Sequence, residues 1–124
     1  MDFEVPLYSR SIAIEKGSIY LLGGFIKRHG MYLKDCSRFD EIFNKLESKR
    51  PMIHPRADHS VCAVGSFIYV VGTFVNGLVY GFCEKYDVQK DKWKEISPLT
   101  IPRSGVALCS FKNQYIFAFG GRVD

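Results

Sequence analysis

One sequence motif recurs along this 124-residue chain, and internal repetition constrains a fold more strongly than any local pattern. In the middle of the chain, Arg56 precedes an apolar run that ends at Gly72, and a second copy runs from Arg103 to Gly120. An earlier apolar run ends at Gly23, so the three glycines lie 49 and 48 residues apart. Repetition at such a period predicts an array of similar structural units rather than one irregular domain.

The repeated phrase has its parts in a constant order. An arginine comes first, then an apolar strand ending in Gly-Gly, an aromatic–Asp pair, a tryptophan and a Pro-Leu or Pro-Met segment. The second copy is the most complete, with Phe67–Val71, Tyr86-Asp87, Trp93 and Ser97-Pro98-Leu99. This combination resembles the kelch motif, one blade of a β-propeller, and the resemblance covers nearly the whole chain. The resemblance implies an all-β fold of four-stranded antiparallel blades.

The first and second copies depart from the pattern at three points. The second has Gly72-Thr73 in place of Gly-Gly, and the first has Leu46 in place of the tryptophan. Only 13 residues separate Arg10 from Gly23, whereas 16 and 17 separate the corresponding residues of the later copies. The register of the first strand is therefore left open.

Apolar runs and turn residues predict four strands in the second copy. We expect them at residues 60–64, 67–71, 79–86 and 93–96. The run at 67–71 is rich in β-branched and aromatic residues, which is typical of a strand covered on both faces. The paired glycines are expected to end such a strand where the backbone crowds a neighbouring blade.

A competing interpretation applies to residues 38–50. Phe39, Ile42, Phe43 and Leu46 fall at helical spacing within this stretch. The repeat favours strands instead, because the stretch aligns with the end of the second copy.

The repeat also predicts how the chain is divided. We expect residues 1–9 to end a preceding blade or form an N-terminal arm, residues 10–55 and 56–102 to form two kelch repeats, and residues 103–124 to begin a third. Propellers usually carry about 4–8 blades. The expected ring is therefore incomplete, and we expect missing sequence or another chain to complete it.

Composition narrows the function classes only moderately. Apolar residues make up 47% and charged residues 24%, with a net charge of +4, all ordinary for a globular protein. The chain shows no basic stripe with interleaved aromatic residues, no long apolar span and no signal-peptide pattern. These observations predict no nucleic-acid or membrane partner and a cytoplasmic location, with cytoskeletal association as an extension from the family resemblance.

Cysteine and histidine spacing does not predict a metal site, a catalytic site or a cofactor. The cysteines fall at two pairs of equivalent repeat positions, so we expect small buried strand residues rather than a cluster of ligands. The recurring aromatic residues are expected to pack in the core. The residues concerned are Cys36, Cys62, Cys83 and Cys109, and Tyr20, Tyr69, Tyr86, Trp93, Phe117 and Phe119.

Basic residues at repeat starts and in one loop are the candidate partner-binding residues. Their structural alternative is to cap carbonyl groups or pair with acids at the blade rim. In kelch substrate adaptors, arginines like Arg103 and Arg122 face an acidic peptide, and guanidinium groups suit carboxylates because they bind them bidentately. The loop after Gly24 combines basic and aromatic residues, which suits protein binding or, alternatively, a solvated hairpin. The full candidate set is Arg10, Arg56, Arg103, Arg122, Lys27, Arg28, His29 and Tyr32.

These patterns favour a non-catalytic protein-interaction module or scaffold. The resemblance implies a substrate adaptor or cytoskeletal protein that binds protein partners, among them an acidic peptide. A second hypothesis is an architectural subunit whose partners cover the open propeller edges. A remote third is a copper enzyme similar to galactose oxidase, for which the chain has Tyr, His and Cys residues but no spacing that assembles them.

Overall fold

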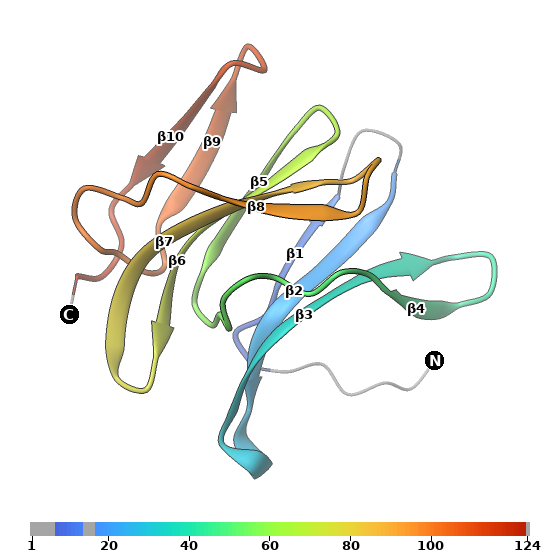
Figure 1. Ribbon diagram of the computed structural model, residues 1–124, viewed down its shortest axis with the longest axis horizontal. Helices are drawn as coiled ribbons and strands as arrows, with labels where there is room; N and C mark the ends of the chain where they lie inside the picture. The colour runs from blue at the N-terminus through green and yellow to red at the C-terminus, as the bar shows by residue number, and fades with distance from the viewer. Residues whose placement is uncertain (1–6, 14–16, 124) are drawn as a thin grey trace.

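The computed structural model describes residues 7–13 and 17–123, and these form three antiparallel sheets side by side (Figure 1). The first two sheets have four strands each in sequence order, and the third has two. The strands of the first sheet are β1 (Arg10–Ala13), β2 (Ile19–Ile26), β3 (Met31–Asp40) and β4 (Lys45–Ser48). Those of the second sheet are β5 (Ser60–Val64), β6 (Phe67–Val75), β7 (Leu78–Asp87) and β8 (Lys92–Ile96). The third sheet holds β9 (Ala107–Phe111) and β10 (Tyr115–Phe119).

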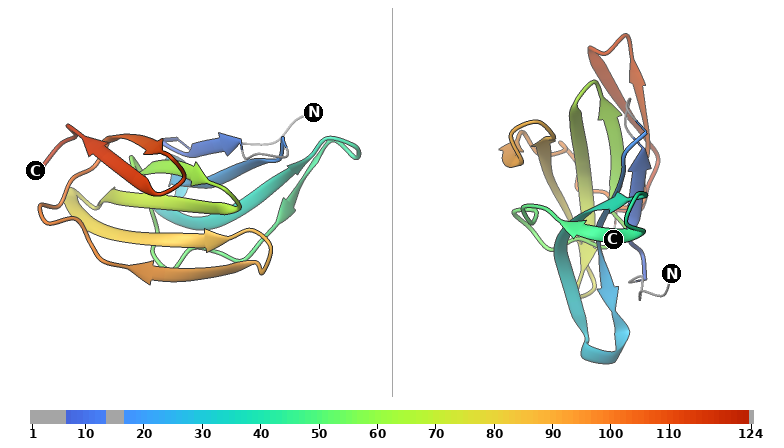
Figure 2. Two further views of the ribbon diagram at one scale, coloured as in Figure 1. Left: turned by 90° about the horizontal axis from the view of Figure 1, so that it is seen from above. Right: turned by 90° about the vertical axis from the view of Figure 1, so that its right-hand side faces the viewer.

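The all-β fold of four-stranded antiparallel blades is confirmed. The first strands of the sheets lie together, with β5 between β1 and β9, and the sheets fan out from this line without closing a ring (Figure 2). A short 3-10 helix, Lys27–His29, at the tip of the β2–β3 hairpin is the one helical segment in the described residues. None of the described residues belongs to a helix long and apolar enough to cross a membrane.

Strand β2 runs through Gly23-Gly24 and β6 runs through Gly72-Thr73, so the expectation that the second strand ends at these positions was wrong for the two four-stranded sheets. In the second sheet, β6 continues to Val75 and β7 begins at Leu78. A β-bulge lies between Val71 and Thr73, and another lies between Leu22 and Gly24 in the first sheet. The extra residue of a bulge bends the strand and lets pairing resume beyond it. The two hairpins therefore extend past the glycines and project on the same side of the molecule (Figure 1).

The glycines do crowd a neighbouring blade, as expected. A Cβ atom on Gly23 would lie 2.6 Å from the carbonyl oxygen of Arg56, and one on Gly72 would overlap the carbonyl oxygen of Arg103. Both glycines have a positive φ, 63° and 71°, which side chains other than glycine rarely adopt. The segment that opens each sheet thus lies directly against the glycine turn of the preceding sheet.

The register of β1 corrects the position of Arg10. Arg10 pairs with Leu22, as Ser60 pairs with Val71 and Ala107 with Phe119. Arg10 is therefore the counterpart of Ser60, four residues beyond the repeat arginine. This explains the short spacing before Gly23 in the first copy. The repeat position of the arginine falls at residue 6, outside the described residues, as does the rest of the segment 1–6.

Two apolar clusters hold the sheets together. The larger joins the first and second sheets through Tyr20, Leu22, Cys36, Met52, Ile68, Val70 and Tyr86. The smaller joins the second and third sheets through Val71, Cys83 and Val106. Trp93 packs against Tyr86 with ring centroids 4.8 Å apart and donates a hydrogen bond of 2.8 Å to the carbonyl of Arg50. Residues of the repeated phrase therefore build the contacts between sheets as well as within them.

The helix considered for residues 38–50 does not form. Its residues belong to β3, a four-residue turn and β4. Ile42 and Phe43 lie in that turn and are 84% and 70% exposed. Their helical spacing came from a turn between two strands rather than from a buried helix face.

In the third sheet, the expected burial of the cysteines and of the recurring aromatic residues is wrong. Cys36, Cys62 and Cys83 are buried as expected, and burial raises the pKa of the Cys36 thiol to about 12. Cys109 is exposed, and so are Phe117 and Phe119, at 47% and 60%. These three residues point away from the second sheet, and no other described sheet covers that face.

Candidate partner-binding site

The residues that directly follow Gly23-Gly24, Gly72-Thr73 and Gly120-Gly121 form the centre of the site. Phe25, Phe74 and Arg122 occupy this equivalent position in the three sheets. Each is tied by backbone hydrogen bonds to the segment that opens its own sheet: Phe25 to Leu7, Phe74 to Ala57, and Arg122 to Ser104. The repeat therefore presents three equivalent side chains along one edge of the molecule.

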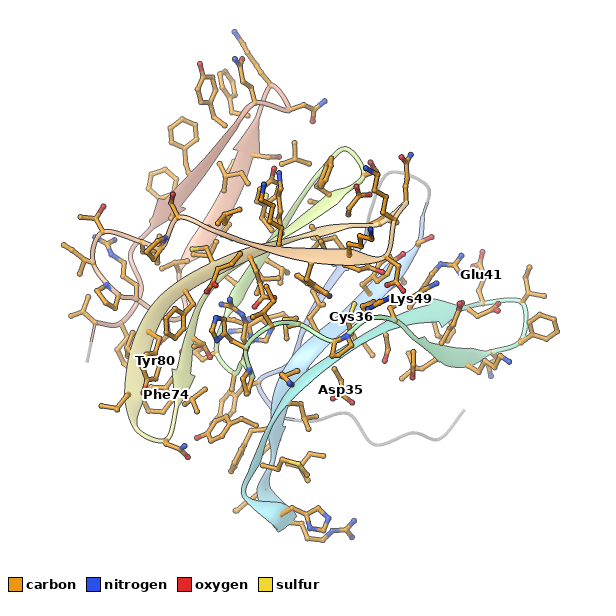
Figure 3. All side chains as sticks on the ribbon, in the orientation of Figure 1. Asp35, Cys36, Glu41, Lys49, Phe74 and Tyr80 are labelled. Atoms are coloured by element: carbon orange, nitrogen blue, oxygen red, sulfur yellow. The ribbon has the colours of Figure 1, made fainter. Side chains whose placement is uncertain are left out.

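A cavity of about 390 Å³ lies among these positions. Aromatic rings form most of its wall, and Asp58 adds a carboxylate. The rings of Phe25 and Tyr32 pack together with centroids 4.7 Å apart, across the β2–β3 hairpin. The lining residues come from all three sheets: Tyr8, Phe25, Tyr32, Ala57, Asp58, Phe74 and Arg122. Figure 3 shows Phe74 on the projecting β6–β7 hairpin.

Asp58 is held in place before any ligand arrives. Its Oδ1 accepts a hydrogen bond of 3.1 Å from Nη2 of Arg10, and its backbone carbonyl accepts one of 2.8 Å from the N–H of Gly105. Its φ of 51° is in the left-handed region, which Asp tolerates better than most residues. Arg10 thus neutralises the one carboxylate of the cavity, and the two residues connect the first and second sheets.

Arg122 lies over the ring of Phe74. The centre of its guanidinium group is 4.1 Å from the ring centroid, a cation–π contact. Its side chain is exposed, and it forms no ion pair with an acidic residue of the described chain. The guanidinium is therefore oriented by the aromatic ring and has its hydrogen-bond donors available.

Arg56 is a structural residue and is not accessible to a partner, which removes it from the binding set. It is fully buried and binds Oε2 of Glu84 through Nε at 3.0 Å and Nη2 at 2.8 Å. Its Nη1 donates to the carbonyl groups of Gly72 and Phe82. Asp58, two residues away in the sequence, pairs with Arg10 and not with Arg56. The arginine fixes the opening segment of the second sheet to its β6–β7 hairpin.

Arg103 repeats one of these contacts. Its Nη1 donates a hydrogen bond of 3.2 Å to the carbonyl of Gly120, as Nη1 of Arg56 does to Gly72. The side chain is half-buried and forms no ion pair with any described residue. It does not line the cavity around Asp58 but borders a separate hollow with Leu99 and Ala118.

The basic loop residues lie at the tip of the β2–β3 hairpin. Lys27, Arg28 and His29 are exposed in the 3-10 helix, while Tyr32 is half-buried and faces the cavity. The structure thus brings Tyr32, Arg10 and Arg122 to one site and keeps Lys27, Arg28 and His29 on a projection beside it. No three described His, Cys, Asp or Glu side chains are close enough together to hold a metal ion.

A buried histidine lies beneath the site. His59 is fully buried, and burial lowers its pKa to about 3, with the charges of Arg56 and Arg10 acting in the same direction. The imidazole is therefore neutral at physiological pH. It packs close to Gly23, so it belongs to the contact between the first and second sheets rather than to the cavity.

Sequence reasoning missed Tyr8, Phe25 and Asp58 as site residues. Phe25 follows Gly23-Gly24 and Phe74 follows the equivalent Gly72-Thr73, so both could have been found by aligning those positions across the repeats. Tyr8 and Asp58 also occupy equivalent positions in their sheets. Tyr8 follows Leu7, which pairs with Phe25, and Asp58 follows Ala57, which is hydrogen-bonded to Phe74. Their convergence depends on how neighbouring sheets pack, which no single repeat reveals.

Side-by-side four-stranded meanders joined in sequence order are the blades of a β-propeller. The chain is similar to kelch-like protein 13 of Homo sapiens, with 29% identity over 123 residues, covering 94% of this chain and 19% of that protein. It is similar to kelch-like protein 38 of Rattus norvegicus, with 31% identity over 120 residues, covering 93% of this chain and 20% of that protein. Kelch-like protein 4 of Homo sapiens is 33% identical over 85 residues, covering 68% and 12%.

The repeats, the blades and these similarities show that the chain belongs to the kelch-repeat family. No family model matches the chain. The chain spans about a fifth of the length of the curated relatives it matches.

Proposed function

We propose that this chain is a protein-interaction module that binds a partner polypeptide at the cavity and the neighbouring β2–β3 hairpin tip. The observation that carries the proposal is the convergence of equivalent residues from three sheets on one aromatic cavity. Loops and hairpin ends on a rigid β scaffold are where binding specificity usually resides. Aromatic residues and arginines dominate the binding energy of protein interfaces.

The groups at the site support binding rather than catalysis. Aromatic rings and guanidinium groups recognise side chains, and the carboxylate of Asp58 is already paired with Arg10. Lys27 and Arg28 add positive charge beside the cavity, which favours an acidic partner and speeds its association. The finer roles implied by the resemblance, a substrate adaptor or a cytoskeletal scaffold in the cytoplasm, belong to this proposal.

Site-specific photocrosslinking tests the proposal. A photoreactive amino acid at Tyr32 is expected to give discrete covalent adducts in a mammalian cell extract. The same amino acid at Lys90, an exposed residue in the β7–β8 turn, serves as the matched control. The double change Lys27→Glu and Arg28→Glu is expected to weaken the Tyr32 adducts severalfold. Equal adducts from both positions, or none from Tyr32, would count against this binding face.

A second candidate role is favoured by the apolar face of the third sheet. Phe111, Tyr115, Phe117 and Phe119 are 50%, 51%, 47% and 60% exposed and lie on the same face of β9 and β10. The equivalent face of the second sheet packs against aliphatic residues of the third, including Leu108. We infer that the exposed face accepts a further kelch-type blade with an aliphatic surface, in an architectural role.

Self-association of the chain tests this second role. An uncovered face of this kind is expected to make the isolated chain associate as its concentration rises. Replacing Phe117 and Phe119 by Thr keeps the strand propensity and is expected to abolish concentration-dependent sedimentation. The paired control replaces Ile42 and Phe43, which are exposed in a turn, by Thr. If the wild-type chain stays monomeric at high concentration, the exposed face needs no cover.

A further inference from the structure

We propose that a second copy of the chain binds head to tail, so that the outer face of its first sheet packs on the exposed face of the third sheet. The inference rests on the second role proposed above and names the partner that covers this face. It predicts self-association through two different surfaces of the chain rather than through one surface paired with itself.

The contact between the first and second sheets shows what such an interface contains. Tyr20 and Leu22 of the first sheet pack against an apolar face of the second sheet. The rings of Tyr20 and Tyr86 meet edge to face, with centroids 5.9 Å apart. The second sheet contributes Ile68, Val70 and Tyr86, with Trp93 packed beside them. Each sheet thus has a forward face, which packs on the following sheet, and a rear face, which packs on the preceding sheet.

The exposed face of the third sheet is a forward face. The pairing of its two strands makes Phe117 the counterpart of Tyr20. Phe119, two residues further along the same strand, is the counterpart of Leu22. Tyr20 and Leu22 are 2% and 0% exposed, whereas Phe117 and Phe119 are 47% and 60% exposed. The two phenylalanines therefore hold the positions that a following sheet buries.

The outer face of the first sheet is the matching rear face. Side chains alternate between the two faces of a strand, so β2 directs Ile19 and Leu21 away from the second sheet. Ile19 is 42% exposed and Leu21 is half-buried. The strand register gives four correspondences with the rear face of the second sheet. Ile19, Leu21, Phe39 and Leu46 correspond in this order to Ile68, Val70, Tyr86 and Trp93.

The two faces can pack together without an ion pair. On the rear face of the second sheet, Val70 pairs with Glu84, whose buried carboxylate needs Arg56 as its partner. On the first sheet the equivalent position is held by Ser37, which pairs with Leu21. Strands β9 and β10 place no charged side chain on the exposed face of the third sheet. Burying a serine costs less than burying an ion, so apolar contact dominates this interface.

The glycine turn of the third sheet distinguishes head-to-tail packing from a symmetric pair. Gly23 and Gly72 each lie against a backbone carbonyl of the segment that opens the following sheet. Gly120 has a similar backbone, with a φ of 68°, yet a Cβ there would meet no atom within 4 Å. A first sheet from a second copy brings an opening segment to this turn. Two third sheets packed face to face would leave both turns open, so Gly120 favours the head-to-tail arrangement.

The number of sheets predicts how many copies associate. Head-to-tail contacts close into a ring when the rotation between copies allows it, and otherwise they continue into a filament. Propellers usually carry about 4–8 blades. Each copy supplies three sheets, so two copies supply six, within that range, and three copies supply nine, beyond it. We therefore expect a closed dimer with two identical contacts.

Two variants, each with one face changed, test the inference. The forward-face variant carries Phe117→Thr and Phe119→Thr. The rear-face variant carries Ile19→Thr and Leu21→Thr, and threonine keeps the strand propensity in both. Sedimentation velocity is expected to show a dimer for the wild-type chain and an association about tenfold or more weaker for each variant alone, because apolar contact is lost. An equimolar mixture of the two variants is expected to form a dimer with one copy of each, since one contact stays intact.

Backbone amide NMR provides a second measurement and shows whether each variant is folded. On dilution of the wild-type chain, amide shifts are expected to change in β2 and β3 as well as in β9 and β10. Adding the unlabelled forward-face variant to the isotope-labelled rear-face variant is expected to shift the amides of β9 and β10. The matched control is Ile42→Thr with Phe43→Thr, which changes two exposed residues of a turn and is expected to dimerise like the wild-type chain.

The outcomes separate this inference from the proposed function. A folded rear-face variant that self-associates like the wild-type chain would overturn head-to-tail packing, while the exposed face would still need a cover. A mixture of folded variants that shows no association would also overturn it. A wild-type chain that stays monomeric at high concentration would overturn both this inference and the second role. Binding of a partner at the cavity is independent of all three results, and the adducts at Tyr32 decide it.

Discussion

The second and third sheets begin with the same sequence motif, but the residues of that motif lie in different structural environments in the two sheets. Arg56 is fully buried against Glu84, whereas its counterpart Arg103 is half-buried and forms no ion pair with any described residue. Cys62 is buried and its counterpart Cys109 is exposed. The sequence phrase is therefore not enough to set the role of a residue. The strands and sheets that cover it decide whether it is structural or available.

The carboxylate of Glu84 explains the difference between the arginines. It lies on β7, the third strand of the second sheet, and also accepts hydrogen bonds from the backbone N–H groups of Ile53 and His54. The described part of the third sheet has two strands and supplies no such carboxylate. The same guanidinium thus becomes the centre of a buried network in one sheet and a surface group in the other.

The largest difference in stability is expected between variants of Arg56 and Arg103. Arg56→Met is expected to lower the free energy of unfolding by about 3–5 kcal/mol because it leaves Glu84 buried without its partner. Arg103→Met is expected to cost less than about 1 kcal/mol because its side chain is partly solvated. Urea denaturation of both variants measures the difference. Similar midpoints would show that burial does not separate the two arginines.

The next largest loss of stability is expected at Gly72, compared with its counterpart Gly120. Gly72 and Gly120 have similar positive φ values, 71° and 68°, so replacing either by Ala introduces comparable backbone strain. A Cβ at Gly72 would overlap the backbone of Arg103, whereas one at Gly120 would meet no atom within 4 Å. We expect Gly72→Ala to be more destabilising than Gly120→Ala by about 2 kcal/mol, from overpacking against a rigid carbonyl. Thermal unfolding of the pair checks this, and equal losses would mean that the sheets separate easily at this contact.

Trp93 extends the comparison to the first sheet, where Leu46 holds the same position. Trp93→Leu removes the hydrogen bond to Arg50 and the ring contact with Tyr86, and is expected to cost about 2 kcal/mol. Trp93→Phe retains a ring and loses the hydrogen bond, so it is expected to cost about half as much. Chemical denaturation distinguishes the two variants. A neutral Trp93→Leu change would show that the outer strands contribute little to the contact between sheets.

Much of the fold could be predicted because the same sequence motif occurs more than once along the chain. The apolar run at Phe67–Val71 and the turn at Gly65-Ser66 specify a hairpin by local chemistry, and the period places the other sheets. The register of β1 could not be predicted, because the first copy offers Arg10 as a false match for the repeat arginine. Only the pairing of Arg10 with Leu22 resolves it.

The site was less predictable than the fold. Arg122 was found from the family resemblance and Tyr32 from loop chemistry, but the cavity that joins them needs three sheets packed in order. The burial of Arg56 depends on Glu84, which lies 28 residues further along the chain. Packing between repeats is a long-range property, so a pattern read within one repeat cannot separate a buried arginine from an exposed one.

The smallest effect is expected from pH and concerns His59, whose counterpart in the third sheet is Val106. The folded chain holds His59 neutral, with its pKa lowered to about 3 by burial, whereas the unfolded chain protonates it below about pH 6.5. The unfolded state therefore binds more protons between these values, and stability falls as the pH is lowered through this window. From pH 7 to pH 5.5 the expected loss attributable to His59 is about 1 kcal/mol. His59→Val introduces the residue type found at the equivalent position of the third sheet. It is expected to remove the contribution of His59 to the pH dependence, whatever its effect on absolute stability. Urea midpoints at both pH values measure the slope, and an unchanged slope in the variant would show that His59 is already accessible to protons in the folded chain.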